Sequence, residues 1–293
     1  MDLSIVIPHL NKMASLAKCL SSIPSAAGTL SHEIIVVDNG SVDGSRERVN
    51  RDFPKAVLLQ NKTNEGFGRA VNHGLRIAQG RYLLCLNNDT LLSPLSLERL
   101  VAFMEGQPEA GIAGGKILNR DGSLQLSARS FPGIETAFFN RSGFLTRLFP
   151  KNPFSRRYLL SDWDHNSPKE VDWVSGSFFL IRRSLIEKIG LFDERFFLYC
   201  EDVDYCRRAK EAGYRVYYVP TSHLIHETGY SEKKFNTLFF HHQSMYRFYK
   251  KHYSKGFVGD IAVLGGIAVR FSVKAVFLTG RKLLGENRNG SSS

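Results

Sequence analysis

Residues 82–89 read Tyr82-Leu-Leu-Cys-Leu-Asn-Asn-Asp89, an apolar run that ends abruptly in three polar side chains. Five consecutive apolar residues bounded by turn-forming residues predict a buried strand from Tyr82 to Leu86. The polar residues then lie directly past its carboxyl end. Earlier apolar runs end in the same way, since His9 and Asn11 follow Leu3 to Ile7 and Asp38 follows Glu33 to Val37.

Helical patterns separate these strands. Leu16, Leu20 and Ile23 recur at helical spacing, and Ser41 is placed to cap a helix that runs to about Phe53. A third strand spans 57–60, and a further helix places Ala70, Val71, Gly74, Leu75 and Ala78 on one face. Repeated β-α units with fully apolar strands predict an α/β fold, a mostly parallel sheet covered by helices on both faces. Ligands of such sheets bind at the carboxyl ends of the strands.

The second half of the chain is less regular at first. Residues 116–170 are punctuated by prolines and predict a long irregular insert, whose Arg147, Lys151, Arg156 and Arg157 are either a solvated stretch or a contact for an anionic acceptor. Regular pattern then returns, and the expected elements are strands at 171–174, 177–181 and 216–219 and helices at 184–190, 201–213 and 232–253.

Net charge and cysteine content limit which partners and which cellular compartment the sequence favours. The formal charge is +11, and residues 245–293 hold nine Lys/Arg against two acids, which gives +7 in the tail alone. Such a tail favours a polyanionic partner: phospholipid, nucleic acid or a phosphorylated substrate. The cysteines form no Cys-x-x-Cys pair and no signal peptide is recognised, so we expect reduced, buried thiols in a cytoplasmic protein.

The last apolar segment, 257–284, is interrupted by Asp260, Arg270 and Lys274, which disfavours a simple transmembrane helix. Arg270, Lys274 and Arg281 are spaced to share one helix face. A basic stripe on an apolar helix suits the surface of an anionic membrane. The alternative is packing against the protein's own body or a second copy.

Several polar residues are candidates for chemistry. Asp89, just past a buried strand, either binds a metal ion or belongs to a turn, because Asn-Asn-Asp also favours turns. Asp38 either accepts a hydrogen bond from a nucleobase or ribose, or leads into a helix. Glycines 66 and 68 open a helix where backbone N–H groups can approach an anion. No Gly-x-Gly-x-x-Gly follows the first strand, which argues against a dinucleotide-binding dehydrogenase.

Three carboxylates, Glu201, Asp202 and Asp204, fall within four residues. They are either an acid/base site, with at least one pKa raised by mutual repulsion, or charges that favour a helix N-terminus. His226 is either a second metal ligand or a structural histidine.

Taken in order, these pieces resemble the family 2 glycosyltransferases of GT-A fold, most closely the rhamnosyltransferase-like bacterial branch. The resemblance spans about residues 3–230. It rests on the following motifs: Ser4-Ile-Val-Ile-Pro8, Val37-Asp-Asn-Gly-Ser41, Asn64-Glu-Gly-Phe-Gly68 with Asn72, Leu86-Asn-Asn-Asp-Thr90, Gly176-Ser-Phe-Phe-Leu180, Phe192-Asp-Glu-Arg-Phe-Phe197, Glu201-Asp-Val-Asp204 and His226-Glu-Thr-Gly229.

The resemblance implies a role for each position. Asp38 would contact the nucleobase, Asn88 the ribose or diphosphate, and the donor pocket would be lined by His9, Asn11, Asn64 and Gly66. Asp89 would be the last residue of the Asp-x-Asp motif and would bind Mg²⁺ or Mn²⁺ together with His226. Asp202 would be the general base, Glu201 would assist it, and Gly176 and Asp204 would lie on the acceptor side. One departure is Asn87 at the first motif position, which leaves a single carboxylate for the metal.

The resulting hypothesis is an inverting transferase. It would move a sugar, with dTDP-rhamnose as the first candidate donor, to a saccharide or polyprenyl-diphosphate-linked acceptor in cell-surface polysaccharide synthesis. Residues 1–230 would be a catalytic GT-A domain, with a nucleotide-binding half at about 1–115 and an acceptor half at 116–230. Residues 231–293 would be a basic helical appendage in peripheral contact with the cytoplasmic face of the inner membrane, with no nucleic-acid partner. The alternatives are a catalytically inactive nucleotide-sugar or membrane-binding module, and a nucleotidyltransferase that releases pyrophosphate.

Overall fold

A computed structural model gives the fold and describes residues 1–133, 152–227 and 235–289. The chain groups into two compact units. One comprises residues 1–194 and 201–229, and the other comprises 195–200 and 230–293. The basic positions Arg147 and Lys151, singled out in the sequence, lie outside the described residues.

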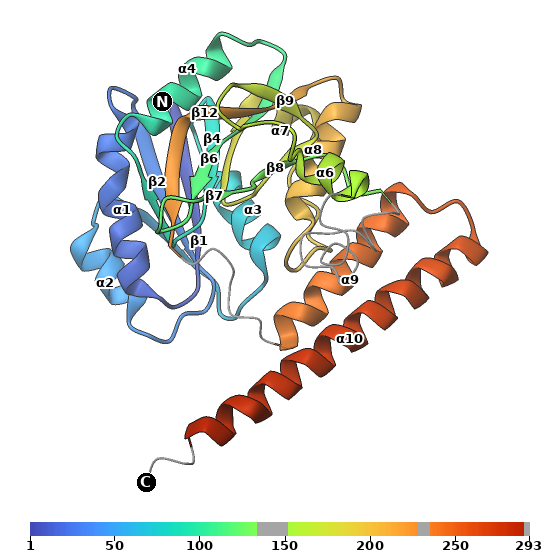
Figure 1. The fold of residues 1–293 in the computed structure, drawn as a ribbon. Helices are drawn as coiled ribbons and strands as arrows, with labels where there is room; N and C mark the ends of the chain where they lie inside the picture. Colours follow the sequence, from blue (N-terminus) through green and yellow to red (C-terminus); the bar gives the residue numbers. More distant parts are fainter. Residues whose placement is uncertain (134–151, 228–234, 290–293) are drawn as a thin grey trace. The chain divides into compact units, whose positions relative to one another are not determined.

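The first unit is built on one large mixed sheet (Figure 1), with strand order β3-β2-β1-β4-β11-β6-β12-β5. In this path β3, β2, β1, β4, β6 and β12 run in one direction, whereas β11 and β5 run the opposite way. The strands are β1 (Leu3–His9), β2 (His32–Asp38), β3 (Val57–Gln60), β4 (Tyr82–Leu86), β5 (Thr90–Leu92), β6 (Ala110–Leu118), β7 (Leu124–Gln125), β8 (Ala128–Arg129), β9 (Lys169–Val171), β10 (Trp173–Val174), β11 (Phe178–Arg182) and β12 (Arg215–His226).

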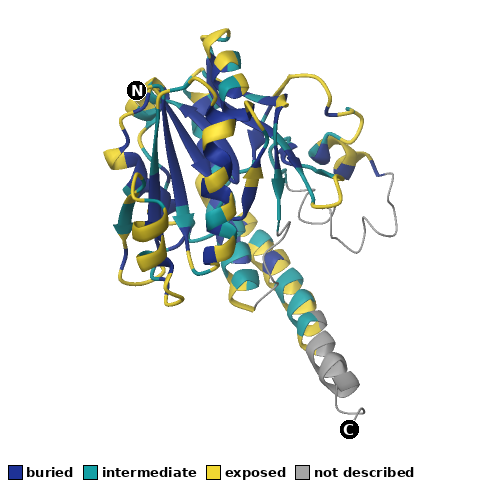
Figure 2. Ribbon diagram, turned by 90° about the vertical axis from the view of Figure 1, so that its left-hand side faces the viewer, coloured by how far each residue is buried: buried dark blue, intermediate teal, exposed yellow. Residues whose placement is uncertain are grey.

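Helices cover both faces of this sheet. The helices of the first unit are α1 (Met13–Ala27), α2 (Ser45–Asp52), α3 (Phe67–Ile77), α4 (Ser96–Glu105), α6 (Pro153–Leu159), α7 (Arg183–Ile189) and α8 (Glu201–Glu211). Apolar residues of α1 and α4 pack with Leu3, Ile5 and Leu84 on one face. On the other face α3 lies so close to β1 that a Cβ at Gly74 would stand 2.4 Å from a methyl of Val6. Figure 2 shows the central strands as buried. The predicted α/β architecture, mostly parallel and flanked by helices, is confirmed.

Three elements differ from the sequence prediction. Helix α2 begins at Ser45 rather than near Ser41, because the N–H of Ser41 is bound by the Asp38 carboxylate and Gly44 adopts φ +75°. The sequence did not predict β6, which lies partly in the stretch expected to be irregular. Strand β12 continues to His226, seven residues past the predicted end, through a register shift between Val219 and His223. This extension carries His226 to the carboxyl end of the sheet.

The second unit contains α9 (Phe235–His252) and α10 (Phe257–Asn289), which confirms the expected helical appendage. Ser244 on α9 donates a hydrogen bond to the carbonyl of Leu198, and the ring of Phe240 stacks on Phe197. Lys250 on α9 forms an ion pair with Asp260 on α10. In the part of the chain that the structure describes, no helix has the combined length and apolarity needed to cross a membrane.

Candidate active site

Asp89 and His226 come together although they are 137 residues apart in the chain. Asp89 stands three residues past β4, and His226 ends β12, whose pairing with β5 sets His226 opposite Thr90. The Oδ1 atom of Asp89 lies 2.9 Å from Nε2 of His226, and both side chains are about one-tenth exposed. The N–H of Glu227 also donates to the carbonyl of Asp89 at 2.8 Å. Both predicted metal ligands therefore lie at the same edge of the sheet.

The neighbours of His226 suit a cation between the two side chains. Nδ1 of His226 lies 3.3 Å from Oε1 of Gln125, an oxygen that accepts a hydrogen bond from an Nδ1–H, so the lone pair of Nε2 faces the Asp89 carboxylate. Two lone pairs 2.9 Å apart repel unless a proton or a metal ion lies between them. Within residues 1–133, 152–227 and 235–289, no three His, Cys, Asp or Glu side chains gather as a metal cluster. Among the described residues, Asp89 and His226 are thus the two candidate ligands, and a bound cation would take others from a bound molecule or water.

Asp202 is tied to the same strand end through β11. Its Oδ2 accepts the N–H of Gly176 at 2.9 Å, and its Oδ1 accepts the N–H of Val203 at 2.9 Å. The next residue, Ser177, accepts a hydrogen bond through its carbonyl from the N–H of Asn87 at 3.2 Å. This chain of contacts links Asp202, at the start of α8, to the Asn-Asn-Asp turn that carries Asp89.

Two adjacent acids open α8: Glu201, which is buried, and Asp202, which is half-buried. Burial, together with the charge of Asp202, raises the pKa of Glu201 well above the usual range. Burial also raises the pKa of Asp202, while the N–H groups of Gly176 and Val203 and the charge of Arg129 oppose that rise. Among the described residues, Oε2 of Glu201 has no hydrogen-bond partner. A carboxylate with a raised pKa is a better proton acceptor near neutral pH, which suits a general base.

The third acid of the group, Asp204, is in a different environment. Its side chain is fully buried, and its Oδ2 accepts a hydrogen bond from Nε of Arg208 at 3.0 Å. Arg208 in turn donates to the carbonyls of Ile189 and Leu191. A side chain closed off in this way supports the packing of α8 rather than facing an acceptor, so the geometry favours a structural role for Asp204 over the predicted acceptor-side role.

We predict that Asp204→Ala lowers the free energy of unfolding by about 3–5 kcal/mol, because it leaves the Arg208 charge without this carboxylate. The pair of Arg207 and Glu211 on the same helix, in which Glu211 is 57% exposed, is the matched control, and Glu211→Ala should cost only about 0.5 kcal/mol. Urea denaturation measures both. Equal, small losses in the two variants would contradict the structural role.

On the donor side, most predicted residues hold one another in place. Asp38 is buried and accepts hydrogen bonds from the N–H of Ser41 and from Arg46. Asn11, at φ +55°, accepts the N–H of Val42 through its side chain at 3.0 Å. These bonds fix the loop between β2 and α2. Contact of Asp38 with a nucleobase stays a prediction.

His9 lies behind Asn88. It is 2% exposed, its Nδ1 lies 2.7 Å from Nδ2 of Asn88, and its Nε2 lies 2.8 Å from Oγ of Ser45. Burial lowers the pKa of His9, so the ring is neutral, with Nδ1 free to accept from the Asn88 amide and Nε2 able to donate to Ser45. His9 therefore orients Asn88, and direct contact between His9 and a ligand is not required.

Asn39, which the sequence did not single out, connects the remaining donor-side residues. Its Nδ2 donates to Oδ1 of Asn64 at 2.9 Å and to the carbonyl of Gly66 at 3.1 Å. Its Oδ1 accepts from Asn61 and from the N–H of Glu65. Gly66, at φ +88°, directly precedes α3. The signal in the sequence was the place of Asn39 in the motif Val37-Asp-Asn-Gly-Ser41, beside Asp38.

Two cationic side chains near Asp89 were also missed. The carboxylate of Glu227 lies 2.9 Å from Nζ of Lys18 and 3.3 Å from Nη2 of Arg120, and these contacts lower the pKa of Glu227. Lys18 and Arg120 are well exposed and come from α1 and from the turn after β6. No local sequence pattern identifies Lys18 or Arg120 as site residues, because their connection to this edge of the sheet is their ion pairs with Glu227.

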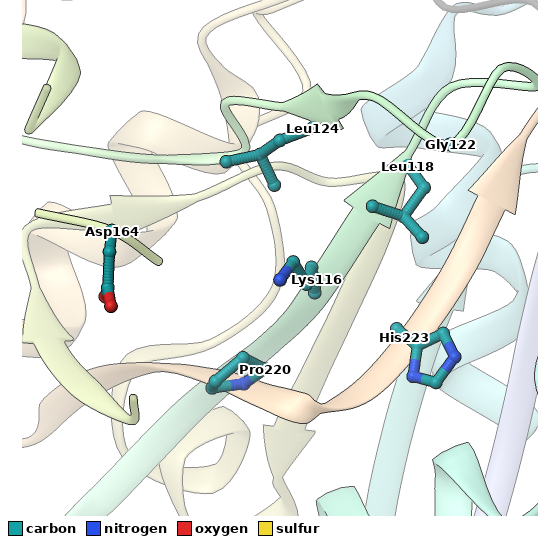
Figure 3. Close-up of a pocket in the computed structure, with 7 residues that line it drawn as sticks. All are labelled: Lys116, Leu118, Gly122, Leu124, Asp164, Pro220 and His223. Atoms are coloured by element: carbon teal, nitrogen blue, oxygen red, sulfur yellow. The ribbon is translucent and has the colours of Figure 1, made fainter. Parts of the chain in front are cut away.

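A separate hollow lies beside β6, β7 and β12 (Figure 3). It is lined by Lys116, Leu118, Gly122, Leu124, Asp164, Pro220 and His223. None of the predicted site residues lines it. The candidate site is therefore defined by the convergence of side chains at the strand ends and not by this hollow.

Comparisons with known proteins bear on the family and the fold. The sequence model of Glycosyl transferase family 2 matches residues 4–190. An N-acetylglucosaminyl-diphospho-decaprenol L-rhamnosyltransferase of Mycobacterium tuberculosis is 31% identical over 256 residues, which is 82% of this chain and 80% of that protein. Rhamnosyltransferase WbbL of Escherichia coli K12 is 31% identical over 183 residues, which is 61% of this chain and 65% of that protein.

Solved structures show the same fold at low identity. A mannosyltransferase of Pyrobaculum calidifontis, solved with GDP-Man and Mn²⁺, superposes with a TM-score of 0.59 at 16% identity and covers 96% of this chain and 79% of its own. GalNAc-T7, solved with UDP, GalNAc and Mn²⁺, gives a TM-score of 0.57 at 16% identity and covers 79% of this chain and 44% of its own. These likenesses confirm the GT-A fold. Because the family model matches more than half of the sequence, the chain belongs to glycosyl transferase family 2 and is a glycosyltransferase.

Proposed function

We propose that this chain is an inverting transferase that moves rhamnose from dTDP-rhamnose to a polyprenyl-diphosphate-linked saccharide in cell-surface polysaccharide synthesis. The observation that carries the proposal is the link from Asp202 through Gly176 and Ser177 to the turn that holds Asp89, itself 2.9 Å from His226. The names of the Mycobacterium tuberculosis and Escherichia coli relatives support the choice of sugar, and the former also supports the lipid-linked acceptor.

In the proposed reaction Asp202 accepts the proton of the acceptor hydroxyl as that oxygen attacks the anomeric carbon. The new carbon–oxygen bond forms on the face opposite the departing nucleoside diphosphate, whose bond to the sugar breaks, so the configuration inverts. Positive charge develops on the sugar in the transition state, as in glycosidases. The hydrogen bonds from Gly176 and Val203 hold the Asp202 carboxylate in position for the transfer.

Asp89 and His226 would hold a divalent cation, Mg²⁺ or Mn²⁺. When bound, such a cation neutralises the charge that grows on the departing diphosphate. With Asn87 in place of a second carboxylate, the cation binds mainly together with the donor. Lys18 and Arg120, which pair with Glu227 beside Asp89, add positive charge that favours a diphosphate there. Action on a lipid-linked acceptor would place the enzyme in peripheral contact with the cytoplasmic face of a membrane.

A panel of nucleotide sugars, each with and without Mn²⁺, tests the donor assignment by thermal shift. A donor at ~100 times its Kd stabilises the folded state by about 2.7 kcal/mol, whereas a nucleotide sugar that does not bind leaves the melting temperature unchanged. We expect dTDP-rhamnose with Mn²⁺ to give the largest shift. A larger shift with a UDP-sugar would reassign the donor.

Turnover with a lipid-linked saccharide then tests the reaction class. We expect release of nucleoside diphosphate in step with sugar transfer. Release of pyrophosphate would instead indicate a nucleotidyltransferase, and donor binding with neither product would indicate an inactive binding module.

A further inference from the structure

The outward face of α10 carries no charge. Among residues 257–276 and 278–279, every exposed position is uncharged. The large apolar side chains on this face are between 47% and 82% exposed, and they are Phe257, Val258, Ile261, Leu264, Val269, Val273 and Val276. Isolated exposed apolar residues are ordinary, but a continuous apolar face of this length marks a surface that meets another apolar phase.

The charged residues of the same stretch lie on the opposite side of the helix. Asp260 is 6% exposed and is paired with Lys250 of α9. Arg270 and Lys274 are half-buried, and their charges act on His242 of α9, whose pKa they help to lower. Arg270 and Lys274 of the predicted basic stripe therefore face α9 instead of solvent, and Figure 2 shows exposed and half-buried positions alternating along the helix. The side of α10 toward α9 therefore holds these charges together with apolar side chains such as Ile267, which is 8% exposed, and Phe271, which contacts Phe239 of α9.

Positive charge flanks the uncharged face at both ends. Lys251 and Lys255 precede α10 and are exposed, and Arg281, Lys282 and Arg288 follow the face in the sequence. An apolar surface between basic ends matches the layered chemistry of an anionic bilayer, whose acyl region is bordered by negative headgroups. Neither a second copy of the chain nor another protein surface requires this arrangement of charge.

We propose that α10 lies flat on an anionic phospholipid surface and inserts its uncharged face, residues 257–279, into the boundary between headgroups and acyl chains. Over this stretch the helix is about 33 Å long at 1.5 Å per residue. Because the helix lies parallel to the membrane surface, this whole length contacts lipid. Asp260, Arg270 and Lys274 then stay on the aqueous side, against α9. This inference deepens the proposed membrane contact and so rests on the proposed function.

Sedimentation of the full chain with phospholipid vesicles tests this inference. Wild type should sediment with vesicles that contain phosphatidylglycerol, and less with phosphatidylcholine alone or at high salt. The double variant Ile261→Glu with Val269→Glu should lower the partition coefficient about tenfold or more, because it places charge where apolar side chains enter the acyl boundary. Val57→Glu, which changes a 42% exposed valine on β3, is the matched control and should sediment like wild type.

A second measurement guards against a variant that only disturbs folding. In Val269→Trp the added indole should shift its emission to shorter wavelength and be quenched by brominated lipid when anionic vesicles are added. The background from Trp163 and Trp173 is measured in wild type. Unquenched emission, or equal sedimentation of the double variant and wild type, would overturn the proposal.

Self-association is the competing use of the same face. If light scattering shows a wild-type dimer that the double variant converts to a monomer, and neither binds vesicles, the face joins two copies and the lipid proposal is wrong. The thermal shift with a nucleotide sugar needs no vesicle. A normal donor shift with no lipid binding would therefore remove this inference alone and leave the proposed transferase standing.

Discussion

Asp202→Asn should lose ~10²–10⁴-fold in kcat while the Kd for the donor stays close to that of wild type. The amide oxygen can still accept the N–H of Gly176, whereas the hydrogen bond from Val203 is lost, and the side chain can no longer take a proton. Steady-state turnover gives kcat, and calorimetry with donor and Mn²⁺ gives the Kd. The loss should therefore appear in the chemical step and not in binding.

Asp52→Asn is the matched control, since Asp52 pairs with Arg51 at the end of α2 and is remote from the strand ends that hold the site. It should turn over like wild type. Undiminished kcat in Asp202→Asn would move the general base to another residue. A parallel loss in both variants would indicate a general disturbance of the fold.

The pH dependence of kcat/KM is an independent test of Asp202 as the general base. Burial raises the pKa of Asp202, and a base acts only when ionised, so kcat/KM should fall as the pH drops through a value above the ordinary aspartate pKa of ~3.9. Glu201→Gln removes the neighbouring acid and should shift this acid limb. An acid limb that is the same in wild type and Asp202→Asn would assign it to another group.

Asp89→Ala should abolish most of the increase in donor affinity that Mn²⁺ produces. Residues that merely orient a metal ligand cost ~10–100-fold in metal affinity when changed, so loss of one of two protein ligands should cost at least as much. Gln125→Ala, which removes only the acceptor beside Nδ1 of His226, should fall within that ~10–100-fold range. Donor titrations by calorimetry, with Mn²⁺ and with chelator, measure both effects.

His226→Ala tests whether Asp89 and His226 bind the same cation. If the two side chains hold one cation, the double variant Asp89→Ala with His226→Ala should lose little more than either single variant. Additive losses, or Mn²⁺ dependence that survives in Asp89→Ala, would place the cation elsewhere. Asp52→Ala serves as the control for removing a carboxylate.

The strand and the turn that carry Asp89 were predictable from the sequence, but the approach of His226 to Asp89 was not. Strand β4 has the bounds predicted from its apolar run, and the turn to Asp89 follows from Asn87 and Asn88. The 2.9 Å approach of His226 depends on the extension of β12 past Pro220, beyond the strand predicted at 216–219. Only the resemblance to a family implied that Asp89 and His226 act together.

Strand β6 shows why the sheet centre was harder to predict. Gly111, Gly114 and Gly115 weaken its apolar pattern. A Cβ at Gly115 would stand 2.3 Å from Cε1 of Phe178, and one at Gly114 would stand 2.7 Å from Cβ of Val174. The need for glycine is therefore set by side chains more than 50 positions away, which a local window does not include.

The order of strands has a consequence for recombination between relatives. Strand β11 lies between β4 and β6, and β5 pairs with β12, so each predicted half of the first unit supplies strands to the interior of the other. A fragment cut at the junction near residue 115 would leave β4 with a bare apolar edge that invites aggregation. Chimeras that exchange only a nucleotide-binding half should therefore fail to fold, whereas exchange of the whole sheet should succeed, and new donor preferences would have to arise by changes within an intact scaffold.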